Sequence, residues 1–470
     1  MNGSHQSFHR KFLWVLIPLL IVWGLTDVRS RAAFDPAHPD RHRTDFTVFP
    51  EAGAAFFDGR DPYEVSNPRG WKYLYPPFFA LVMAPLHALD PQAQGLVWFF
   101  LSLGMAWGCY RESRRLWHGL ARAGHGSPDP GFTLWVGWCA FLAAFIPALD
   151  CLQRGQVGLL KTWLLLLGMR LVVERSSPAG EFLGGLVLAL PCVIKVIPAL
   201  PVGVFLLMIR GVRKKQGMAF REGGGPALGG LVLGGLLYLF VLPSALVGWQ
   251  ANLHHLKSWY EKVGHRSQGI GDTLRLGQPH TLRNQSLDNA LFWLGNMVYL
   301  SVTEPDKSLR TRFYLIQDYP GRTFMAQALP RAVVKGLRLL LLLFLIPLVW
   351  RGARRGREDE ALAVTGLACL AALVVSPVAR GHYFMFLLPA WLFVPRLFYR
   401  HGRTRTARRL ALAAPLLVIP HYVLLPYLGP VGFLGIGTVL WYLVAGALWM
   451  RLPAVVPATD KNRSKTAKLV

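Results

Sequence analysis

The chain is poor in acidic residues and in cysteine, and it lacks the common motifs of metal-dependent and nucleophilic catalysis. Its 470 residues include 25 Asp and Glu against 51 Lys and Arg, and only five cysteines. The cysteines have no metal-site spacing and lie mostly within or beside apolar runs, which indicates packing residues. There is no HExxH motif, no CxxC pair, no nucleophile elbow and no tight aspartate pair, so the sequence indicates neither a metal nor a cofactor.

A long polar segment is missing as well, so the chain has no room for a soluble nucleotide-binding domain. Neither a P-loop nor a GxGxxG turn in the right context occurs. The net charge of +26 would suit a nucleic-acid partner, but the Lys and Arg residues gather in short loops between apolar runs. That distribution is the topology pattern of a membrane protein, and we therefore do not expect nucleic acid as a partner.

Long apolar runs dominate what is present, since 53% of the residues are hydrophobic. The runs are continuous rather than alternating, which favours helices, and only helices or closed barrels satisfy their backbone in lipid. We therefore predict an all-α integral membrane protein, a multispanning bundle of about 10–13 transmembrane helices. The runs that predict spans are residues 12–29, 94–110, 131–149, 156–173, 182–195, 198–210, 226–247, 331–350, 360–377, 382–399, 409–427 and 431–450.

Clusters of positive charge orient these spans, because short cytoplasmic loops carry an excess of Lys and Arg. Such clusters begin at Arg111, Arg210, Arg351, Arg396 and Lys461. With all of them on the cytoplasmic side of the plasma membrane, the polar, non-repetitive segments face the extracytoplasmic side. Those segments are residues 30–75, 153–158, the region near Lys195, residues 248–330 and residues 376–383.

One membrane domain, residues 1–456, is the simplest organisation, followed by a basic cytoplasmic tail at 457–470 that we expect to be disordered. Within the domain, residues 30–75 form the first extracytoplasmic loop and residues 248–330 the second large one. Two segments fit poorly as spans, because residues 76–90 are short and broken by a proline and residues 287–301 are short and follow a polar motif. Each is expected to be a half-span or an interfacial helix.

The first polar loop carries the strongest candidate for catalysis. Asp45 follows the first span closely enough to lie at the bilayer surface, where partial desolvation would raise its pKa toward the range of a general base for a sugar hydroxyl. Alternatively, Asp45 caps an interfacial helix, and Asp35, Asp40 and Glu51 are other candidates for the base. Tyr75 lies in a Tyr-Pro-Pro run that starts a helix well, and it would also wall the site.

Further polar residues border the apolar runs on the same face. Gln153, Arg154 and Gln156 lie between two spans, where they would bind a sugar or a phosphate, or else form a satisfied turn. Lys195 stands in an otherwise apolar run flanked by prolines, and a lysine inside a membrane segment is costly. We expect it to meet a lipid phosphate in an outer cavity, unless it extends to the interface.

Two later motifs complete the set of candidate binding residues. Asn284 and Gln285 belong to a donor-rich cluster that precedes a short apolar segment. Arg380 and His382 connect two spans, where they would contact a phosphate or share in proton transfer. A structural capping role for His382 is the alternative.

Taken in order along the chain, these motifs match those of one known family. The residues that carry the match are Asp45, Gly59-x-Asp61-Pro62-Tyr63, Tyr73-Leu74-Tyr75-Pro76-Pro77, Gly155-Gln156, Lys195 to Pro198, Asn284-Gln285-Ser286-Leu287, Ser376-Pro377 and His382-Tyr383. The pattern resembles glycosyltransferase family 87 of the GT-C superfamily, the polyprenol-phosphate-mannose-dependent mannosyltransferases. No single motif is highly specific, but their order and their spacing between spans resemble the family over most of the chain.

The resemblance implies a GT-C fold with an extracytoplasmic site and inverting transfer to a hydroxyl of a lipid- or glycan-linked acceptor. The donor would be a polyprenyl-phosphate sugar, usually mannose and in some relatives arabinofuranose. Asp45 would be the general base, and Arg154, Lys195, Arg380 and His382 would be candidates for binding the donor phosphate. The chain departs from the usual pattern in Gly155-Gln156-Val157-Gly158, which has Gly where relatives often carry Asn, and in residues 378–380, which replace a more usual aromatic.

Two other functions fit the spans less well. A transporter or flippase of polyprenyl-linked glycans would explain Lys195, but it predicts inverted repeats and charges near the membrane midplane, and the sequence shows neither. A polymerase or ligase of surface polysaccharide would gather its cations in one large outer loop, whereas here they are spread over several loops.

Overall fold

The computed structural model describes residues 15–121, 128–174, 177–264, 284–308, 311–312, 328–424, 428 and 432–453. These residues are largely helical, and the only β-pairing among them is an isolated bridge between Ser66 and Lys72. The all-α prediction is therefore confirmed. The predicted tail at 457–470 and parts of the second polar region lie outside the described residues, so the predicted domain organisation stays a prediction.

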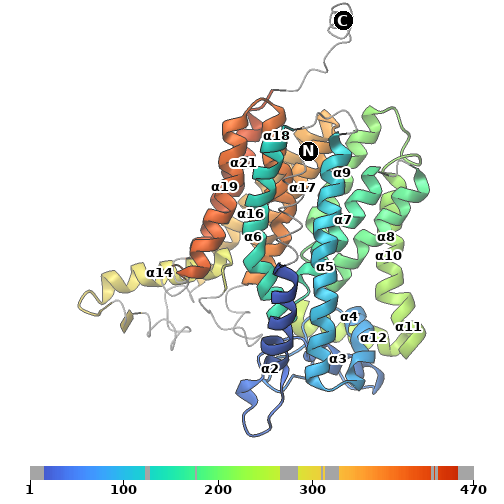
Figure 1. The fold of residues 1–470 in the computed structure, drawn as a ribbon, viewed down its shortest axis with the longest axis vertical. Coiled ribbons are helices and arrows are strands. Elements are labelled where there is room, and N and C mark those ends of the chain that lie inside the picture. Colours follow the sequence, from blue (N-terminus) through green and yellow to red (C-terminus); the bar gives the residue numbers. More distant parts are fainter. Residues whose placement is uncertain are drawn as a thin grey trace, which may run out of the picture.

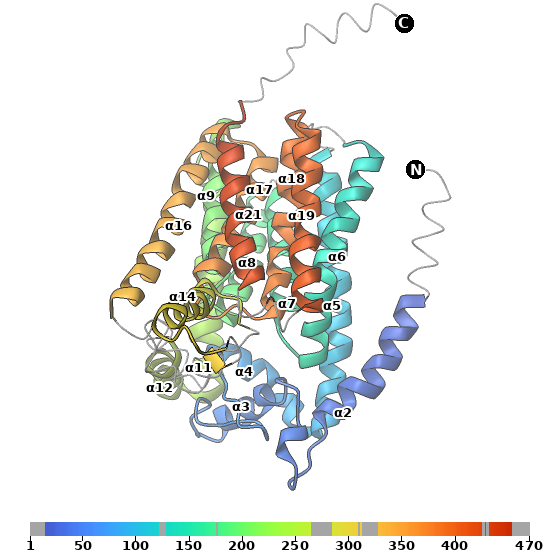
Figure 2. The ribbon, with the colours of Figure 1, turned by 90° about the vertical axis from the view of Figure 1, so that its left-hand side faces the viewer.

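A bundle of long helices running between two ends forms the body of the molecule (Figure 1; Figure 2). Residues 15–32 form a first helix that includes η1 (Gly24–Val28) and α2 (Arg29–Ala32). The bundle helices are α5 (Pro91–Leu120), α6 (Pro130–Arg154), α7 (Gly158–Glu174), α8 (Pro178–Ile194), α9 (Ala199–Lys215), α10 (Gly225–Leu236) continuing through η5 (Leu237–Val241) into α11 (Leu242–Val247), α16 (Ala328–Arg355), α17 (Glu358–Val375), α18 (Leu388–Arg400), α19 (Thr404–Val423) and α21 (Phe433–Met450).

Four helices in the described part of the chain are long and apolar enough to cross a membrane. They are Pro130–Arg154, Gly225–Val247, Ala332–Arg355 and Phe433–Met450. The other predicted spans, where described, are also helical, but they are shorter or carry more charge; α17, for example, begins with three acidic residues. The chain is thus a helical membrane protein, while the predicted number of about 10–13 spans stays a prediction.

Short helices collect at one end of the bundle, which we call the site end. They are α3 (Val48–Phe57), α4 (Pro77–Met83), η3 (Ala84–Ala88), α12 (Trp249–Trp259), η6 (Tyr260–Gly264) and α14 (Leu287–Thr303) (Figure 1). With seven residues, α4 is only about 10 Å long and cannot cross a bilayer. Both views show α14 lying across the direction of the bundle helices. The two segments that fitted poorly as spans are therefore not full spans along the bundle.

The basic clusters lie at the opposite end, which we call the basic end. The C-terminal halves of α5, α9, α16 and α18, which run toward this end (Figure 1), contain Arg111, Arg210, Arg351 and Arg396. The predicted separation between polar motifs and basic loops is thus seen in the helix directions.

Buried ion pairs cross-link the helices at the basic end. Arg213 on α9 is 2% exposed and donates from Nε to Glu181 on α8 at 2.8 Å and from Nη1 to Glu358 on α17 at 3.3 Å. Its Nη2 also donates to the carbonyl of Val172 on α7 at 2.9 Å. One guanidinium therefore ties four helices together and leaves neither buried carboxylate uncompensated.

Helices α8 and α10 approach each other through glycines. A Cβ at Gly185 would lie 2.0 Å from the carbonyl oxygen of Ala227, and a Cβ at Gly230 would lie 2.0 Å from that of Phe182. Backbone cannot move aside easily, so both positions require glycine for this close helix contact. Gly229, the neighbour of Gly230, has open space around its Cβ position.

We predict that Gly230→Val lowers the melting temperature of the detergent-purified protein by several degrees, because the added side chain forces α10 away from α8. Overpacking of this kind costs about 1–3 kcal/mol. The matched control is Gly229→Val, which has the same change in helix propensity but no neighbour to displace. Equal shifts for the two variants would show that the α8–α10 contact does not depend on Gly230.

Candidate active site

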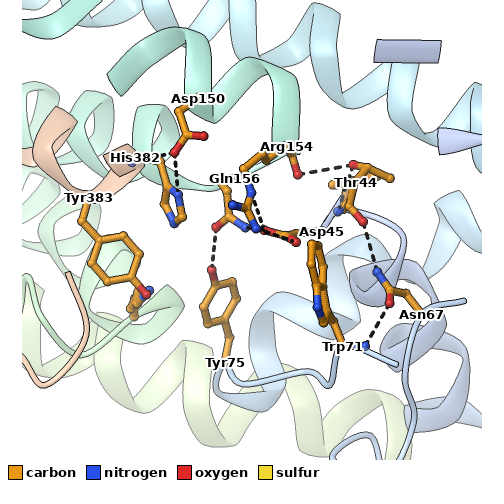
Figure 3. A network of polar contacts seen from close by, with 12 residues as sticks. Thr44, Asp45, Asn67, Trp71, Tyr75, Asp150, Arg154, Gln156, His382 and Tyr383 are labelled. Atoms are coloured by element: carbon orange, nitrogen blue, oxygen red, sulfur yellow. Dashed lines mark hydrogen bonds and ion pairs between the residues drawn. The ribbon is translucent and has the colours of Figure 1, made fainter. Parts of the chain in front are cut away.

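The carboxylate of Asp45 lies at the centre of a polar network at the site end (Figure 3). It belongs to the loop that leads into α3 and is buried. The guanidinium of Arg154 donates from Nε to Oδ2 at 3.2 Å and from Nη2 to Oδ1 at 3.3 Å. Gln156 also donates from its side-chain nitrogen to Oδ2. Oδ1 therefore accepts only one hydrogen bond from the described residues, and it keeps lone-pair capacity for a further donor.

The backbone fixes this position before the side chains contribute. The N–H of Asp45 donates to the carbonyl of Arg154 at 2.9 Å, and Thr44 Oγ1 donates to the same carbonyl at 3.3 Å. On the other side, Asn67 donates from its amide to the carbonyl of Thr44 at 3.0 Å, while its Oδ1 accepts the N–H of Trp71 at 3.0 Å. These hydrogen bonds connect the first loop to the end of α6, and they also connect two parts of the loop to each other.

Gly155 permits this close approach. It caps the C-terminus of α6 with φ of 67°, in the left-handed region that glycine adopts without strain. A Cβ at this position would lie 2.5 Å from the Cβ of Phe46. Glycine is therefore required both by the turn and by the neighbouring loop.

Tyr75 and Gln156 form one wall of the site. The hydroxyl of Tyr75 donates to Oε1 of Gln156 at 3.4 Å, which orients the amide so that its nitrogen faces Asp45. The carbonyl of Tyr75 accepts the hydroxyl of Tyr63 at 3.0 Å. The ring of Tyr75 also stacks on Phe49 of α3, with 5.3 Å between the centroids. The wall is therefore anchored in the aromatic core of the first loop.

Cationic side chains surround this carboxylate. The guanidinium of Arg154 lies over the ring of Trp71, with Cζ 5.3 Å from the centroid. Arg380 interacts electrostatically with both Asp45 and Asp150. Lys195, which follows α8, donates to the hydroxyl of Tyr383, and its Nζ lies 5.2 Å from the ring centroid of Tyr75. The predicted residues Asp45, Tyr75, Arg154, Gln156, Lys195 and Arg380 are therefore brought together.

His382 enters the same region with a carboxylate partner. Asp150, on the last turns of α6, accepts both the backbone N–H of His382 at 2.9 Å and its ring Nδ1 at 3.1 Å. The imidazole is buried, and it interacts electrostatically with Arg154 and Lys195 as well. His382 thus lies beside the network of Asp45 rather than at a distant helix cap.

Three predicted residues have other contacts. Gln153 donates to Asp27 of the first helix at 2.9 Å. Oδ1 of Asn284 accepts the N–H of Ala379 at 2.9 Å, and the N–H of Gln285 donates to the carbonyl of Ala379 at 2.7 Å. The last two contacts hold the segment that leads into Arg380, so Asn284 and Gln285 support the site indirectly.

Burial raises the pKa of Asp45 above its usual value, although Arg154, Arg380 and the hydrogen bond from Gln156 all act in the opposite direction. The other first-loop carboxylates lie in more open surroundings. Asp40 and Asp58 are exposed, Asp58 pairs with Arg60 at 3.0 Å, and Asp35 and Glu51 are partly exposed. Asp45 is the buried one among these carboxylates, and its raised pKa is the direction that a general base requires.

Two residues of the network were not among the predicted binding residues. Lys161 on α7 is buried, with its Nζ 5.4 Å from the ring centroid of Tyr383. Asp150 holds His382. Sequence reasoning could have found both residues. Lys161 is a lysine within an apolar run, and Asp150 is an acidic residue directly after one.

The arrangement combines one buried carboxylate with several cations and hydrogen-bond donors. Such a site can remove a proton from a hydroxyl and compensate negative charge on a departing phosphate. No group of three or more His, Cys, Asp or Glu side chains that could hold a metal ion occurs within the described ranges.

Comparison with known proteins finds a match to one protein family. The family model described as glycosyltransferase family 87 matches residues 73–377, more than half of the chain. No curated protein and no solved structure matches. The matched segment includes Tyr75, Arg154, Gln156 and Lys195, whereas Asp45 precedes it and His382 follows it.

We predict that Gly155→Ala lowers the melting temperature by several degrees more than Gly59→Ala does. Both glycines have positive φ, 67° and 71°, so both variants bear a similar backbone strain of about 1–2 kcal/mol. Only Gly155 has a neighbour, Phe46, in the path of the new Cβ. If the two variants melt at the same temperature, Phe46 moves aside freely and the contact between the first loop and α6 is not tight.

Proposed function

Because the chain belongs to glycosyltransferase family 87, we propose that this glycosyltransferase moves a sugar, mannose, from a polyprenyl-phosphate carrier to a hydroxyl of a lipid- or glycan-linked acceptor. The observation that supports the reaction is the burial of Asp45 against Arg154 and Gln156, next to Lys195 and Arg380. A carboxylate beside a group of cations suits a reaction that deprotonates a hydroxyl and releases a phosphate.

Asp45 acts as the general base in this proposal. Its Oδ1 receives the proton of the acceptor hydroxyl, whose oxygen attacks the anomeric carbon of the donor sugar. The bond from that carbon to the phosphate oxygen breaks, and its electron pair stays with the departing polyprenyl phosphate. One direct displacement inverts the anomeric configuration, and it needs a single carboxylate with no covalent intermediate.

The cations serve the departing phosphate. The guanidinium of Arg154 already binds the carboxylate of Asp45, so the main role of Arg154 in this proposal is to orient the base. Lys195 and Arg380 interact electrostatically with each other as well as with Asp45, and the resulting excess of positive charge favours an anionic group beside the base. Polyprenyl phosphate is a good leaving group, so charge compensation suffices and no strong acid is required.

The reaction is proposed to occur on the extracytoplasmic face of the plasma membrane. The argument is the separation of the two ends, since basic clusters favour the cytoplasm and all the residues of the network of Asp45 lie at the other end. A carrier lipid in the outer leaflet then presents its phosphate at the depth of the bundle's site end.

We predict that Asp45→Asn reduces sugar transfer from polyprenyl-phosphate-[14C]mannose by more than roughly a hundredfold, because the amide cannot take the acceptor proton. The assay compares membranes with equal protein levels. Asp58→Asn, which changes an exposed carboxylate of the same loop, should keep wild-type transfer. Transfer that survives Asp45→Asn would assign the base to another residue, and absence of transfer by the wild type would count against mannose as the donor sugar.

We predict that transfer falls as the pH is lowered through the pKa of Asp45. An ordinary aspartate has a pKa of about 4, and we expect this acidic limb at a higher pH than that. The sign follows because only the ionised carboxylate is a base and burial raises its pKa. Gln156→Leu should move the acidic limb to higher pH, since it removes a hydrogen bond to the ionised form. If the acidic limb stays at the same pH in this variant, the limb does not report the titration of Asp45.

A further inference from the structure

The side chain of Tyr383 lies next to two lysines from different parts of the chain. Lys195, which follows α8, has its Nζ 3.7 Å from the ring centroid and donates to the hydroxyl. Lys161 on α7 is buried, and its Nζ lies 5.4 Å from the same centroid. The two lysines also interact electrostatically with each other. Like charges beside one ring repel unless an anion offsets them, so the surroundings of Tyr383 suit an anionic ligand.

The described residues supply little negative charge to these lysines. Asp45 interacts electrostatically with Lys195, but its carboxylate already forms an ion pair with Arg154 at 3.0 Å. Nζ of Lys161 is in contact with aromatic rings, those of Tyr383 and Phe386, and no carboxylate in the described part of the chain forms an ion pair with it. A lysine in such surroundings is costly without a counter-charge, which a bound anion would provide.

The hydroxyl of Tyr383 accepts one hydrogen bond and keeps its own proton to donate. An ammonium group has three donors and no acceptor, so the hydroxyl oxygen is the acceptor in its contact with Lys195. A phosphate bound here would compensate the charge of Lys195 and keep it in the ammonium form. Within the described ranges, no acceptor receives the phenolic proton. The O–H of Tyr383 is therefore available to an oxygen of a ligand.

This hydroxyl lies on the side of the proposed reaction centre. Nζ of Lys195, which binds it, is 5.2 Å from the ring centroid of Tyr75, a wall of the site. Figure 3 shows the hydroxyl end of Tyr383 on the side of Tyr75. Tyr383 also interacts electrostatically with Asp45 and Arg380. A group bound by the hydroxyl would therefore lie among the residues to which the proposed reaction assigns the phosphate.

The backbone holds Tyr383 in place without a ligand. Its N–H donates to the carbonyl of Arg380 at 2.8 Å. The preceding residue, His382, is bound to Asp150 through its N–H at 2.9 Å and its Nδ1 at 3.1 Å. The ring of His382 also meets that of Tyr383 edge to face, with 4.7 Å between the centroids. The hydroxyl is thus preorganised, as a donor that stabilises developing charge must be.

We infer that Tyr383 binds the phosphate of the donor directly, with its hydroxyl donating a hydrogen bond to a phosphate oxygen while accepting one from Lys195. This inference rests on the proposed function. A hydrogen bond received from an ammonium polarises the O–H and strengthens the bond that it donates. No proton leaves Tyr383 in the reaction, because the acceptor proton goes to Asp45 and the electron pair of the broken bond goes to the phosphate oxygen. The hydrogen bond therefore forms with the donor and persists with the departing polyprenyl phosphate.

The test is the binding of tritiated polyprenyl phosphate to the full-length protein in detergent, for the wild type and for Tyr383→Phe. Phenylalanine keeps the ring beside both lysines and loses only the hydroxyl. We expect the affinity to fall about tenfold or more, because hydrogen bonds to charged groups are the stronger ones. The matched control is Tyr442→Phe on α21, which removes a buried hydroxyl that donates to the carbonyl of Leu341 at 3.1 Å. This control should bind polyprenyl phosphate as the wild type does.

The kinetics of transfer give a second readout that a general structural effect would not reproduce. In Tyr383→Phe, kcat/KM for polyprenyl-phosphate mannose should fall about tenfold or more, while the KM of the acceptor changes less than about twofold. A raised acceptor KM with unchanged donor kinetics would overturn the inference.

A double variant separates direct contact from an effect through Lys195, which loses its acceptor when the hydroxyl is removed. If Tyr383 contacts the phosphate, Tyr383→Phe weakens binding further in a Lys195→Met background. If it does not, the hydroxyl only positions Lys195 and the inference is wrong.

Fluorine NMR decides where Lys195→Met leaves no measurable binding, or where Tyr383→Phe melts well below Tyr442→Phe. Fluorotyrosine introduced in place of Tyr383 keeps the ring and the hydroxyl. Its signal should shift when polyprenyl phosphate is added, and an unchanged signal would overturn the inference.

Failure of the inference is distinguishable from failure of the proposed function. Equal affinity of the wild type and Tyr383→Phe for polyprenyl phosphate would overturn the role of the hydroxyl, while sugar transfer by the wild type would still support the proposed function. A wild type that binds no polyprenyl phosphate would instead contradict the proposed carrier, and the inference would fall with it.

Discussion

The contact between the C-terminal end of α6 and the first loop is the constraint on which the site depends. The carbonyl of Arg154 accepts the N–H of Asp45, while the guanidinium of the same residue binds the carboxylate. A backbone hydrogen bond therefore fixes the position of the loop, and a charge-assisted ion pair fixes the direction of the Asp45 side chain. Gly155 makes both possible, since any larger residue would meet Phe46 before these bonds could form.

The same contact explains how a buried carboxylate is tolerated. Burial disfavours the ionised form of Asp45, and Arg154 with Gln156 offsets part of this penalty without removing it. A fully compensated aspartate would be a weak base, and an uncompensated one would stay protonated. The proposed role of Asp45 as a base requires a position between these limits, and Arg154 contributes to it both a charge and a fixed position on a helix end.

Much of the fold could be predicted from the sequence, because apolar runs and basic loops report helices and their directions directly. Part of the candidate site could be proposed for a similar reason, since Asp45 and Lys195 stand out where charge meets apolar sequence. Gln153 and Arg154 show the limit, because adjacent helical residues point about 100° apart, and only the structure reveals that Gln153 faces Asp27. Asp150 belongs with His382, more than two hundred residues away, and no local pattern reports that pairing.

The two ends of the bundle differ in how their buried charges are arranged. At the basic end, buried pairs such as Arg213 with Glu181 and Glu358 fix several helices relative to one another. At the site end, Lys195 and Arg380 add positive charge beyond what Asp45 and Arg154 balance between themselves. A membrane helix bundle bears such an excess only where an anion or water can approach. The fixed end therefore holds the helices whose opposite termini carry the positive charge that the proposed function assigns to the phosphate of a lipid donor.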